Sequence, residues 1–234
     1  MANDLRIIAI GLDEAGRGPL IGDLAVGLVA IQKGKLGILS IRGVRDSKEL
    51  TPRQREALIK DIMRESVLVM TTYIPPRVID KSRLNKLIAS TMLDMLKTAF
   101  MFLSNMGYFF EVYVDEVKGF ENYLLKELNM YRDLVIEYRM ESNADKKYVV
   151  VSAASIIAKY YRDLNLEAIK MIYGDTGSGY PTDPKTREWL IETYKLYREP
   201  PPVLRRSWST LLRLAPSWYY NPKKGRSILD YMGG

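Results

Sequence analysis

Residues 7–20 set the strongest limit on how this chain can fold. They read IIAIGLDEAGRGPL, so an isoleucine-rich run changes abruptly to the neighbouring acids Asp13 and Glu14, and a Gly-Arg-Gly-Pro sequence follows. A short apolar run bounded by turn residues is typical of a buried strand. The sequence therefore predicts a buried strand that ends in two carboxylates, with a tight glycine-rich loop directly after it.

The two adjacent acids predict a bound cation at this strand end. Like charges within hydrogen-bonding range oppose each other's ionisation, and burying both is costly unless a cation joins them. The following glycines permit tight backbone geometry beside a ligand, and Arg17 between them carries a guanidinium suited to phosphate. We expect metal ligands at Asp13 and Glu14 and a phosphate-facing loop at Gly16, Arg17 and Gly18.

Two other interpretations of this stretch are weaker. Gly11 and Gly16 have the spacing of a P-loop, but Arg17 and Gly18 stand where that loop needs Lys and Ser or Thr. We therefore exclude nucleoside-triphosphate binding of that kind. The remaining alternative is a surface turn whose acids are solvated, and the buried character of the preceding run argues against it.

The chain contains no histidine and no cysteine. It cannot build a Ser-His-Asp triad, a cysteine nucleophile, a typical zinc site or a disulfide. Any metal ion must be held by oxygen ligands, which selects hard cations such as Mg²⁺ or Mn²⁺.

Size and charge narrow the class of protein. With 234 residues, 47% of them hydrophobic, the chain can bury a full core. We expect a main domain over residues 1–184 and a helical, basic and aromatic region packed on it over residues 185–234. A formal charge of +7 favours a polyanionic partner such as nucleic acid. The N-terminus lacks a signal-peptide pattern, so we expect a cytoplasmic protein. We also expect a monomer.

Strand-like and helix-like segments alternate along the chain. Apolar, β-branched or alternating patterns predict strands that begin at residue 7 and that span residues 21–32, 67–73, 109–114 and 134–140. Amphipathic or capped patterns predict helices over residues 52–64, 82–102, 119–130, 147–173 and 185–197, with a connection over residues 34–43. This order predicts an α/β fold: a mixed five-stranded sheet flanked by helices, with a small helical C-terminal appendage.

The pattern of a strand followed by an acid recurs twice. Asp115 follows the fourth strand, and Asp145 lies at the start of a long helix after the fifth. Ligands in α/β folds gather at the carboxyl ends of strands, so these acids can meet Asp13 and Glu14 at one edge. Four carboxylates in one place require divalent cations, and the reaction class that follows is two-metal phosphodiester hydrolysis.

The C-terminal residues 198–226 combine charge with aromatic rings. They contain seven basic residues against one acid, interleaved with Trp208, Trp218, Tyr219 and Tyr220. Such rings either stack on bases or sugars or pack the appendage on the main domain, and the sequence leaves both interpretations open.

Seven motifs occur in a fixed order over about residues 7 to 210. They are Asp13-Glu14-Ala15-Gly16-Arg17-Gly18-Pro19, Asp46-Ser47-Lys48 before Leu50-Thr51-Pro52, Val114-Asp115, Ala144-Asp145 with Lys147-Tyr148, Ser152-Ala153-Ala154-Ser155-Ile156-Ile157-Ala158-Lys159, Arg162-Asp163, and Gly177-Ser178-Gly179-Tyr180-Pro181. This series resembles type 2 ribonuclease H in its archaeal form. The first motif joined to the Ser-Ala-Ala-Ser helix is highly specific.

The resemblance implies a ribonuclease H-like fold and an endonuclease. It implies that Asp13, Glu14, Asp115 and Asp145 hold two Mg²⁺ or Mn²⁺ ions and cut the RNA strand of RNA/DNA hybrids, leaving 5′-phosphate and 3′-hydroxyl ends. It also implies nicking of DNA on the 5′ side of an embedded ribonucleotide.

The resemblance further implies which residues contact the nucleic acid. The backbone of Gly16, Arg17 and Gly18 would lie on the 2′-hydroxyl side of the RNA strand. Tyr180 would stack on the sugar that follows a ribonucleotide. At the phosphate backbone, the matching positions are Ser47, Lys48, Ser155 and Lys159.

The tail over residues 228–232 faintly resembles a sliding-clamp motif, with Gly225 where that motif has Gln. Two rival functions remain open at this point. One is a ribonuclease H-fold nuclease that acts on DNA junctions, and the other is a catalytically silent nucleic-acid-binding module.

Overall fold

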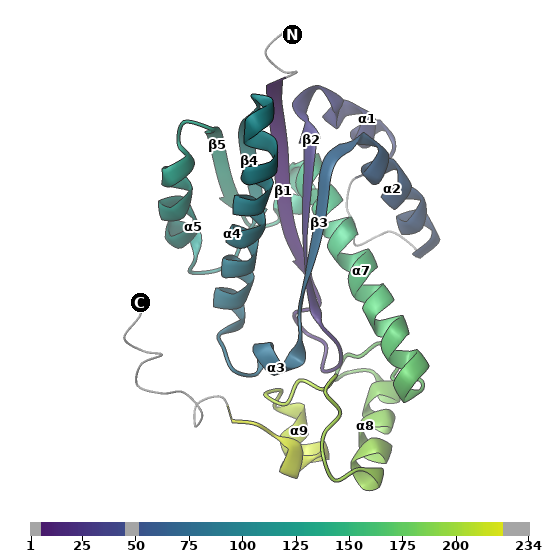
Figure 1. Ribbon diagram of the computed structural model, residues 1–234. Helices are drawn as coiled ribbons and strands as arrows, with labels where there is room; N and C mark the ends of the chain where they lie inside the picture. Colours follow the sequence, from purple (N-terminus) through teal and green to yellow (C-terminus); the bar gives the residue numbers. More distant parts are fainter. Residues whose placement is uncertain (1–5, 45–51, 222–234) are drawn as a thin grey trace. The chain divides into compact units, whose positions relative to one another are not determined.

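The computed structural model describes residues 6–44 and 52–221, and these form two compact units (Figure 1). The first unit contains Met1–Ala15, Ala25–Thr72 and Asn85–Tyr161. The second contains Gly16–Leu24, Tyr73–Leu84 and Arg162–Gly234.

The first unit contains a mixed five-stranded sheet. Its strands are β1 (Ile7–Ala15), β2 (Leu24–Gln32), β3 (Ser66–Ile74), β4 (Phe109–Asp115) and β5 (Val135–Glu141), in the spatial order β3-β2-β1-β4-β5. β1 is antiparallel to β2 and parallel to β4, and β4 is parallel to β5. The predicted mixed α/β sheet is confirmed, although the second strand begins at Leu24 instead of residue 21.

Nine α-helices are described. They are α1 (Leu36–Ile41), α2 (Pro52–Glu65), α3 (Pro76–Ile79), α4 (Leu84–Leu103), α5 (Glu121–Leu128), α6 (Ala144–Lys147), α7 (Val149–Tyr173), α8 (Pro184–Leu196) and α9 (Thr210–Leu214). Two predictions need correction. The expected connection over residues 34–43 contains α1, and the long helix expected from residue 147 is preceded by the separate short helix α6, with Tyr148 extended between them.

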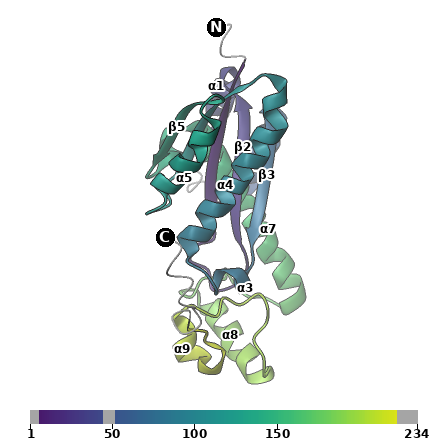
Figure 2. The same ribbon diagram turned by 60° about the vertical axis from the view of Figure 1, so that its left-hand side comes forward.

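Helices cover both faces of the sheet (Figure 1). Ala9, Val29 and Ile31 pack with α1, α2 and the first half of α7 in one buried cluster. On the opposite face, Phe100 of α4 contacts Phe110 of β4, with ring centroids 4.9 Å apart. Figure 2 shows α4 lying along this face of the sheet. By length and composition alone α4 could cross a membrane, but half of its most apolar stretch is buried inside the protein, as expected of a core helix.

Two glycines let α7 lie directly on the sheet. A Cβ added to Gly11 would come within 2.2 Å of the carbonyl oxygen of Val150, and one added to Gly27 within 2.6 Å of that of Ala154. Contacts this short leave no room for a side chain. The backbone of α7 therefore lies in direct contact with β1 and β2.

The second unit has its own apolar core. Trp218 is buried with Leu20, Leu190, Leu204 and Leu211. Of the two interpretations of the C-terminal aromatics, burial supports packing for Trp218, whose indole donates a hydrogen bond of 3.0 Å to the carbonyl oxygen of Arg198.

Candidate active site

The strand register brings Asp13 and Asp115 to the same level of the sheet. β1 and β4 are parallel neighbours in which Leu12 is paired with Val114, and the next residues are Asp13 and Asp115. Residues paired in register project to the same face, here the face that α7 covers. β1 ends at Ala15, so Asp13 and Glu14 lie at the carboxyl end of the strand, as predicted. Both residues are paired with β2.

The helix α7 supplies polar groups next to Asp13. Gly27, the partner of Asp13 in β2, lies directly against the backbone of α7. Ser155 is almost fully buried at this level and forms a side-chain hydrogen bond with Asp13. Lys159 follows Ser155 by one helical turn and therefore lies on the same side of α7.

Asp145 is positioned by a tight turn after β5. Asn143 has a φ of 56°, the lone positive value among the non-glycine residues described, and Asn tolerates this left-handed conformation better than most residues. The next backbone N–H, that of Ala144, donates a hydrogen bond of 2.8 Å to Oδ1 of Asp115. Asp145 follows directly and is 4% exposed. The turn thus links a buried acid to the end of β4.

The carboxylate cluster, defined as Asp13, Glu14, Asp115 and Asp145, carries unfavourable charge. Burial raises the pKa of Asp13 well above its usual value, and the negative charges of Glu14 and Asp115 raise it further. Hydrogen bonds from Ser155 and from the backbone N–H of Glu14, 2.7 Å away, act in the opposite direction. The ionised form of Asp13 is therefore disfavoured in the absence of a cation.

The donor chemistry of the cluster suits a hard divalent cation. All of its ligands would be carboxylate oxygens, and a positive ion would offset the repulsion that raises the pKa of Asp13. Within residues 6–44 and 52–221, no three acidic side chains stand close enough together to hold a metal ion. These residues have the oxygen ligands and the burial that suit a metal ion. Binding an ion requires that the carboxylates move closer together.

A second group, the glycine–tyrosine cluster, consists of Gly16, Arg17, Gly18 and Tyr180. A Cβ on Gly18 would lie 3.2 Å from Cε1 of Tyr180, so the ring lies against the glycine backbone. The guanidinium of Arg162 lies 5.3 Å from the centre of the Tyr180 ring, and its Nη2 donates to the carbonyl oxygen of Ser178. The Tyr180 side chain remains 39% exposed and available for a ligand.

Backbone hydrogen bonds join the two loops of this cluster. The N–H of Leu20 donates to the carbonyl oxygen of Gly179 at 2.7 Å, and Gly179 in turn donates to Oγ1 of Thr186. Trp208 fixes the other side, because its indole donates to the carbonyl oxygen of Gly18 at 3.0 Å. The loop backbone and the tyrosine ring are therefore held in one arrangement.

Sequence reasoning missed Arg205, which organises this loop. It is fully buried, and its guanidinium donates to the carbonyl oxygens of Gly16 at 2.7 Å, Gly22 at 2.9 Å and Arg17 at 3.3 Å. Burial, together with the nearby Arg162, lowers the pKa of Arg205 to about 10, so it stays charged at neutral pH. In the sequence, Arg205 lies in an Arg-Arg-Ser-Trp run, and such a run indicates a basic surface segment and not a buried residue.

The other predicted contacts divide between the two units. The carboxylate cluster, Ser155 and Lys159 belong to the first unit, and the glycine–tyrosine cluster belongs to the second. Ser47 and Lys48 lie outside the described residues.

Comparisons with known proteins identify the family of this chain. The model of the ribonuclease HII family matches residues 10–211. The ribonuclease HII of Hyperthermus butylicus is 40% identical, over 97% of this chain and 95% of that protein. The crystal structure of ribonuclease H2 from Pyrococcus horikoshii OT3 has a TM-score of 0.78 and 35% identity, covering 90% of this chain and 98% of that one.

A solved complex also matches. The ribonuclease HII in the PCNA complex from Archaeoglobus fulgidus gives a TM-score of 0.73 at 32% identity, covering 88% of this chain and 96% of that one. Because the family model, the curated relatives and the solved structures each match most of the chain, the chain belongs to the ribonuclease HII family and is an endonuclease of the ribonuclease H type.

Proposed function

We propose that this enzyme cuts the RNA strand of RNA/DNA hybrids and nicks DNA duplexes on the 5′ side of an embedded ribonucleotide. The observation that carries the proposal is the crowding of negative charge at Asp13, whose pKa is raised by burial and by Glu14 and Asp115. A buried group of anions is unfavourable in a resting structure and becomes favourable when cations and a phosphodiester are bound.

The four acids Asp13, Glu14, Asp115 and Asp145 are the residues that would hold the metal ions, Mg²⁺ or Mn²⁺. When bound, two such ions supply an activated water and stabilise the leaving 3′ oxygen, giving 5′-phosphate and 3′-hydroxyl products. The protein's own part is positioning. Ser155 holds the carboxylate of Asp13, the Ala144 N–H orients that of Asp115, and Lys159 offers a cation for the substrate backbone.

Recognition of the ribonucleotide belongs to the glycine–tyrosine cluster. The 2′-hydroxyl is the local group that separates RNA from DNA, and the backbone at Gly16 and Gly18, which carries no side chain, can approach it closely. The Tyr180 ring, held by Gly18 and Arg162, presents a flat surface to the adjoining sugar.

The deciding experiment uses three matched duplexes: all DNA, DNA with one ribonucleotide, and an RNA/DNA hybrid. Each is incubated with Mg²⁺, with Mn²⁺ and with chelator. We expect cleavage of the two ribose-containing duplexes in the presence of either ion and none with chelator. Asp13→Asn should lower turnover about a thousandfold while hybrid binding is retained. Cleavage of the all-DNA duplex as fast as of the duplex with one ribonucleotide would support the rival nuclease that acts on DNA, and an inert Asp13→Asn change would support a silent binding module.

Ribose recognition has its own test in Tyr180. Tyr180→Phe keeps the ring, whereas Tyr180→Ala removes a stacking surface worth about 1–3 kcal/mol. We expect Tyr180→Ala to lower kcat/KM on the single-ribonucleotide duplex by about tenfold or more, with a smaller loss on the long hybrid, and Tyr180→Phe to change neither. Equal losses on both substrates would separate Tyr180 from junction recognition.

The C-terminal tail is a further proposed contact. The Archaeoglobus fulgidus relative was solved as a PCNA complex. Residues 228–232 of this chain faintly resemble a sliding-clamp motif. These residues lie outside the described part of the chain. We expect size-exclusion chromatography to show co-elution of the full chain with an archaeal sliding clamp, and no co-elution after truncation at residue 221. Retained binding by the truncated chain would reject this tail as the clamp contact.

A further inference from the structure

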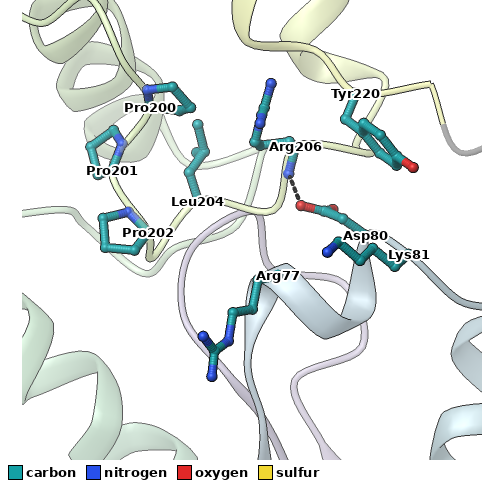
Figure 3. Close-up of a pocket in the computed structure, with 9 residues that line it drawn as sticks. All are labelled: Arg77, Asp80, Lys81, Pro200, Pro201, Pro202, Leu204, Arg206 and Tyr220. Atoms are coloured by element: carbon teal, nitrogen blue, oxygen red, sulfur yellow. Dashed lines mark hydrogen bonds between the residues drawn. The ribbon is translucent and has the colours of Figure 1, made fainter. Parts of the chain in front are cut away.

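The second unit contains a pocket of about 260 Å³ that neither cluster uses. Its walls come from α3 with the residues that follow it and from the C-terminal segment 200–220 (Figure 3). A volume slightly below the range of about 300–1,000 Å³ that encloses drug-sized ligands suits one nucleotide rather than a longer segment.

The charged side chains in the pocket lining are three cations, Arg77, Lys81 and Arg206, and one acid, Asp80. Arg77 and Lys81 line it, both are exposed, and neither forms a side-chain hydrogen bond or ion pair with another residue in the part of the chain that the structure describes. The acid in the lining, Asp80, is committed to the protein. Its Oδ2 accepts from the Arg206 N–H at 2.9 Å, and its Oδ1 accepts from the Ser207 N–H and hydroxyl at 2.9 and 2.7 Å. The pocket therefore favours an anion.

Apolar and aromatic side chains also line the pocket. Tyr220, Leu204 and the prolines 200–202 line the pocket, and the backbone N–H of Tyr220 donates to the carbonyl oxygen of Arg206 at 3.0 Å. That bond fixes the position of the Tyr220 backbone, from which the aromatic side chain extends. A ligand that combines an anionic group with a flat ring matches both walls, and a nucleotide has this composition.

The wall of the pocket is continuous with the loop that faces the ribose. Residues 204–207 form one short segment in which the Arg205 side chain holds Gly16 and Gly22, while the Arg206 and Ser207 N–H groups bind Asp80 in the pocket lining. The N–H of Arg205 also donates to the carbonyl oxygen of Leu20 at 2.9 Å. A strand bound at the loop could thus extend toward the pocket along the second unit.

We propose that this pocket binds one unpaired nucleotide of a single-stranded segment flanking the substrate duplex. Arg77 and Lys81 hold the phosphate, and the base lies against Tyr220 and the proline surface. The proposal rests on the proposed substrate only in taking it to be nucleic acid. Free nucleotides share the same chemistry, and the experiment separates the two sources.

The test measures binding by fluorescence anisotropy of the full chain in chelator. One probe is a blunt RNA/DNA hybrid, and the other is the same hybrid with a four-nucleotide single-stranded overhang. We expect the overhang to tighten binding about tenfold, the scale of one stacked base with its phosphate contact. Arg77→Gln/Lys81→Gln and Tyr220→Ala should each remove most of this gain, and Tyr220→Phe should keep it.

The matched control is Lys170→Gln/Lys195→Gln. Both lysines are on the surface of the second unit, away from the pocket lining, and each pairs with a glutamate three residues away. This double substitution removes two positive charges, as Arg77→Gln/Lys81→Gln does. The control should keep the overhang gain. A loss as large as that of Arg77→Gln/Lys81→Gln would mean that net charge alone acts, which overturns the pocket. Circular dichroism and melting curves verify folding of each variant.

A covalent probe identifies the base contact. With 5-iododeoxyuridine in the overhang, ultraviolet crosslinking and mass spectrometry should find the adduct on Tyr220, and free dTMP should compete only at millimolar concentration. Competition by inorganic phosphate as strong as that by dTMP would overturn the base contact, and tight dTMP competition would overturn the strand as the occupant. A wild type that cleaves the blunt hybrid with Mg²⁺ but gains nothing from the overhang rejects the pocket alone, leaving the proposed function intact.

Discussion

Nη1 of Arg205 lies 2.7 Å from the carbonyl oxygen of Gly16, a hydrogen bond between residues 189 positions apart in the chain. Gly16 has a φ of 94°, a conformation that L side chains rarely adopt, and it begins the loop that precedes Gly18. A carbonyl turned inward and held by a buried cation leaves the opposite face of the loop to its N–H groups. Arg205 therefore acts as a positioning residue for the loop.

We expect Arg205→Met to lower the free energy of unfolding by about 3 kcal/mol, because it leaves buried carbonyl oxygens without donors. Arg205→Lys keeps a charge but cannot reach all three carbonyls, so its loss should be intermediate. Urea denaturation measures both. A positioning role also predicts a larger loss of kcat/KM on the single-ribonucleotide duplex than on the long hybrid. Arg213→Met, at an exposed position of α9, should stay within about 0.5 kcal/mol; a similar loss there would contradict the assignment.

Gly11 and Gly27 should not accept alanine. Added Cβ atoms would meet the backbone of α7 at 2.2 and 2.6 Å and push the helix off the sheet. We expect each change to Ala to destabilise the protein by about 3 kcal/mol or more and to lower turnover, because Ser155 moves away from Asp13.

The matched control for these glycines is Gly37→Ala. Gly37 lies in α1 with nothing within 4 Å of an added Cβ, and alanine is the better helix former by about 1 kcal/mol. Thermal melting should show an unchanged or higher Tm for Gly37→Ala. An equal loss at all three glycines would refute the close contact with α7.

The raised pKa of Asp13 makes the metal-free protein sensitive to pH. A carboxyl whose pKa is higher in the folded than in the unfolded state contributes stability below the unfolded pKa, about 3.9, and loses it as pH rises through the folded value. In chelator, we expect Tm to fall as pH rises above about 4, and Asp13→Asn to flatten this dependence and melt higher than wild type at pH 7.

The pKa of Asp175 is shifted in the opposite direction from that of Asp13, so its effect on stability has the opposite pH dependence. Its hydrogen bond with Lys185 and that from the Gly177 N–H lower its pKa, so its contribution is present at neutral pH and is lost as pH falls through the folded value. Asp175→Asn should therefore lower Tm slightly at pH 7 and have no effect at pH 2. If Asp13→Asn behaved like Asp175→Asn, the electrostatic description of the carboxylate cluster would be wrong.

Asp80 should contribute to stability through the hydrogen bonds that it accepts from Arg206 and Ser207. Asp80→Ala removes the acceptor for two backbone N–H groups and one hydroxyl, and we expect a loss of about 2–3 kcal/mol in urea unfolding. Asp133→Ala, at an exposed position, is the control and should change the free energy of unfolding by less than about 0.5 kcal/mol.

Much of the fold follows from local sequence patterns. The apolar run before Asp13 and the run before Asp115 identify β1 and β4, because burial on both faces leaves a continuous apolar pattern. Residues 34–43 misled the prediction, since three glycines there indicate a connection, yet α1 forms where Leu39 enters the core. Tertiary packing overrides local preference at such a site.

The sequence predicted that Asp13 and Asp115 lie at neighbouring strand ends, but it did not predict the residue that holds the loop at Gly16. Asp13 and Asp115 follow recognisable strands, whereas Arg205 reaches Gly16 across most of the chain, and no periodicity reports such a contact. Gly11 and Gly27 carried an unused signal, because glycine inside a strand often marks close backbone approach.

The pairing of Leu12 with Val114 restricts where the chain can tolerate insertions. One residue added within β4 would shift Asp115 by about 3.3 Å along the strand and turn it to the opposite side of the sheet, parting it from Asp13. Residues 118 and 119, exposed beyond the strand, face no such demand. Length changes among homologous chains should therefore gather after Asp115 and be missing between Phe109 and Asp115.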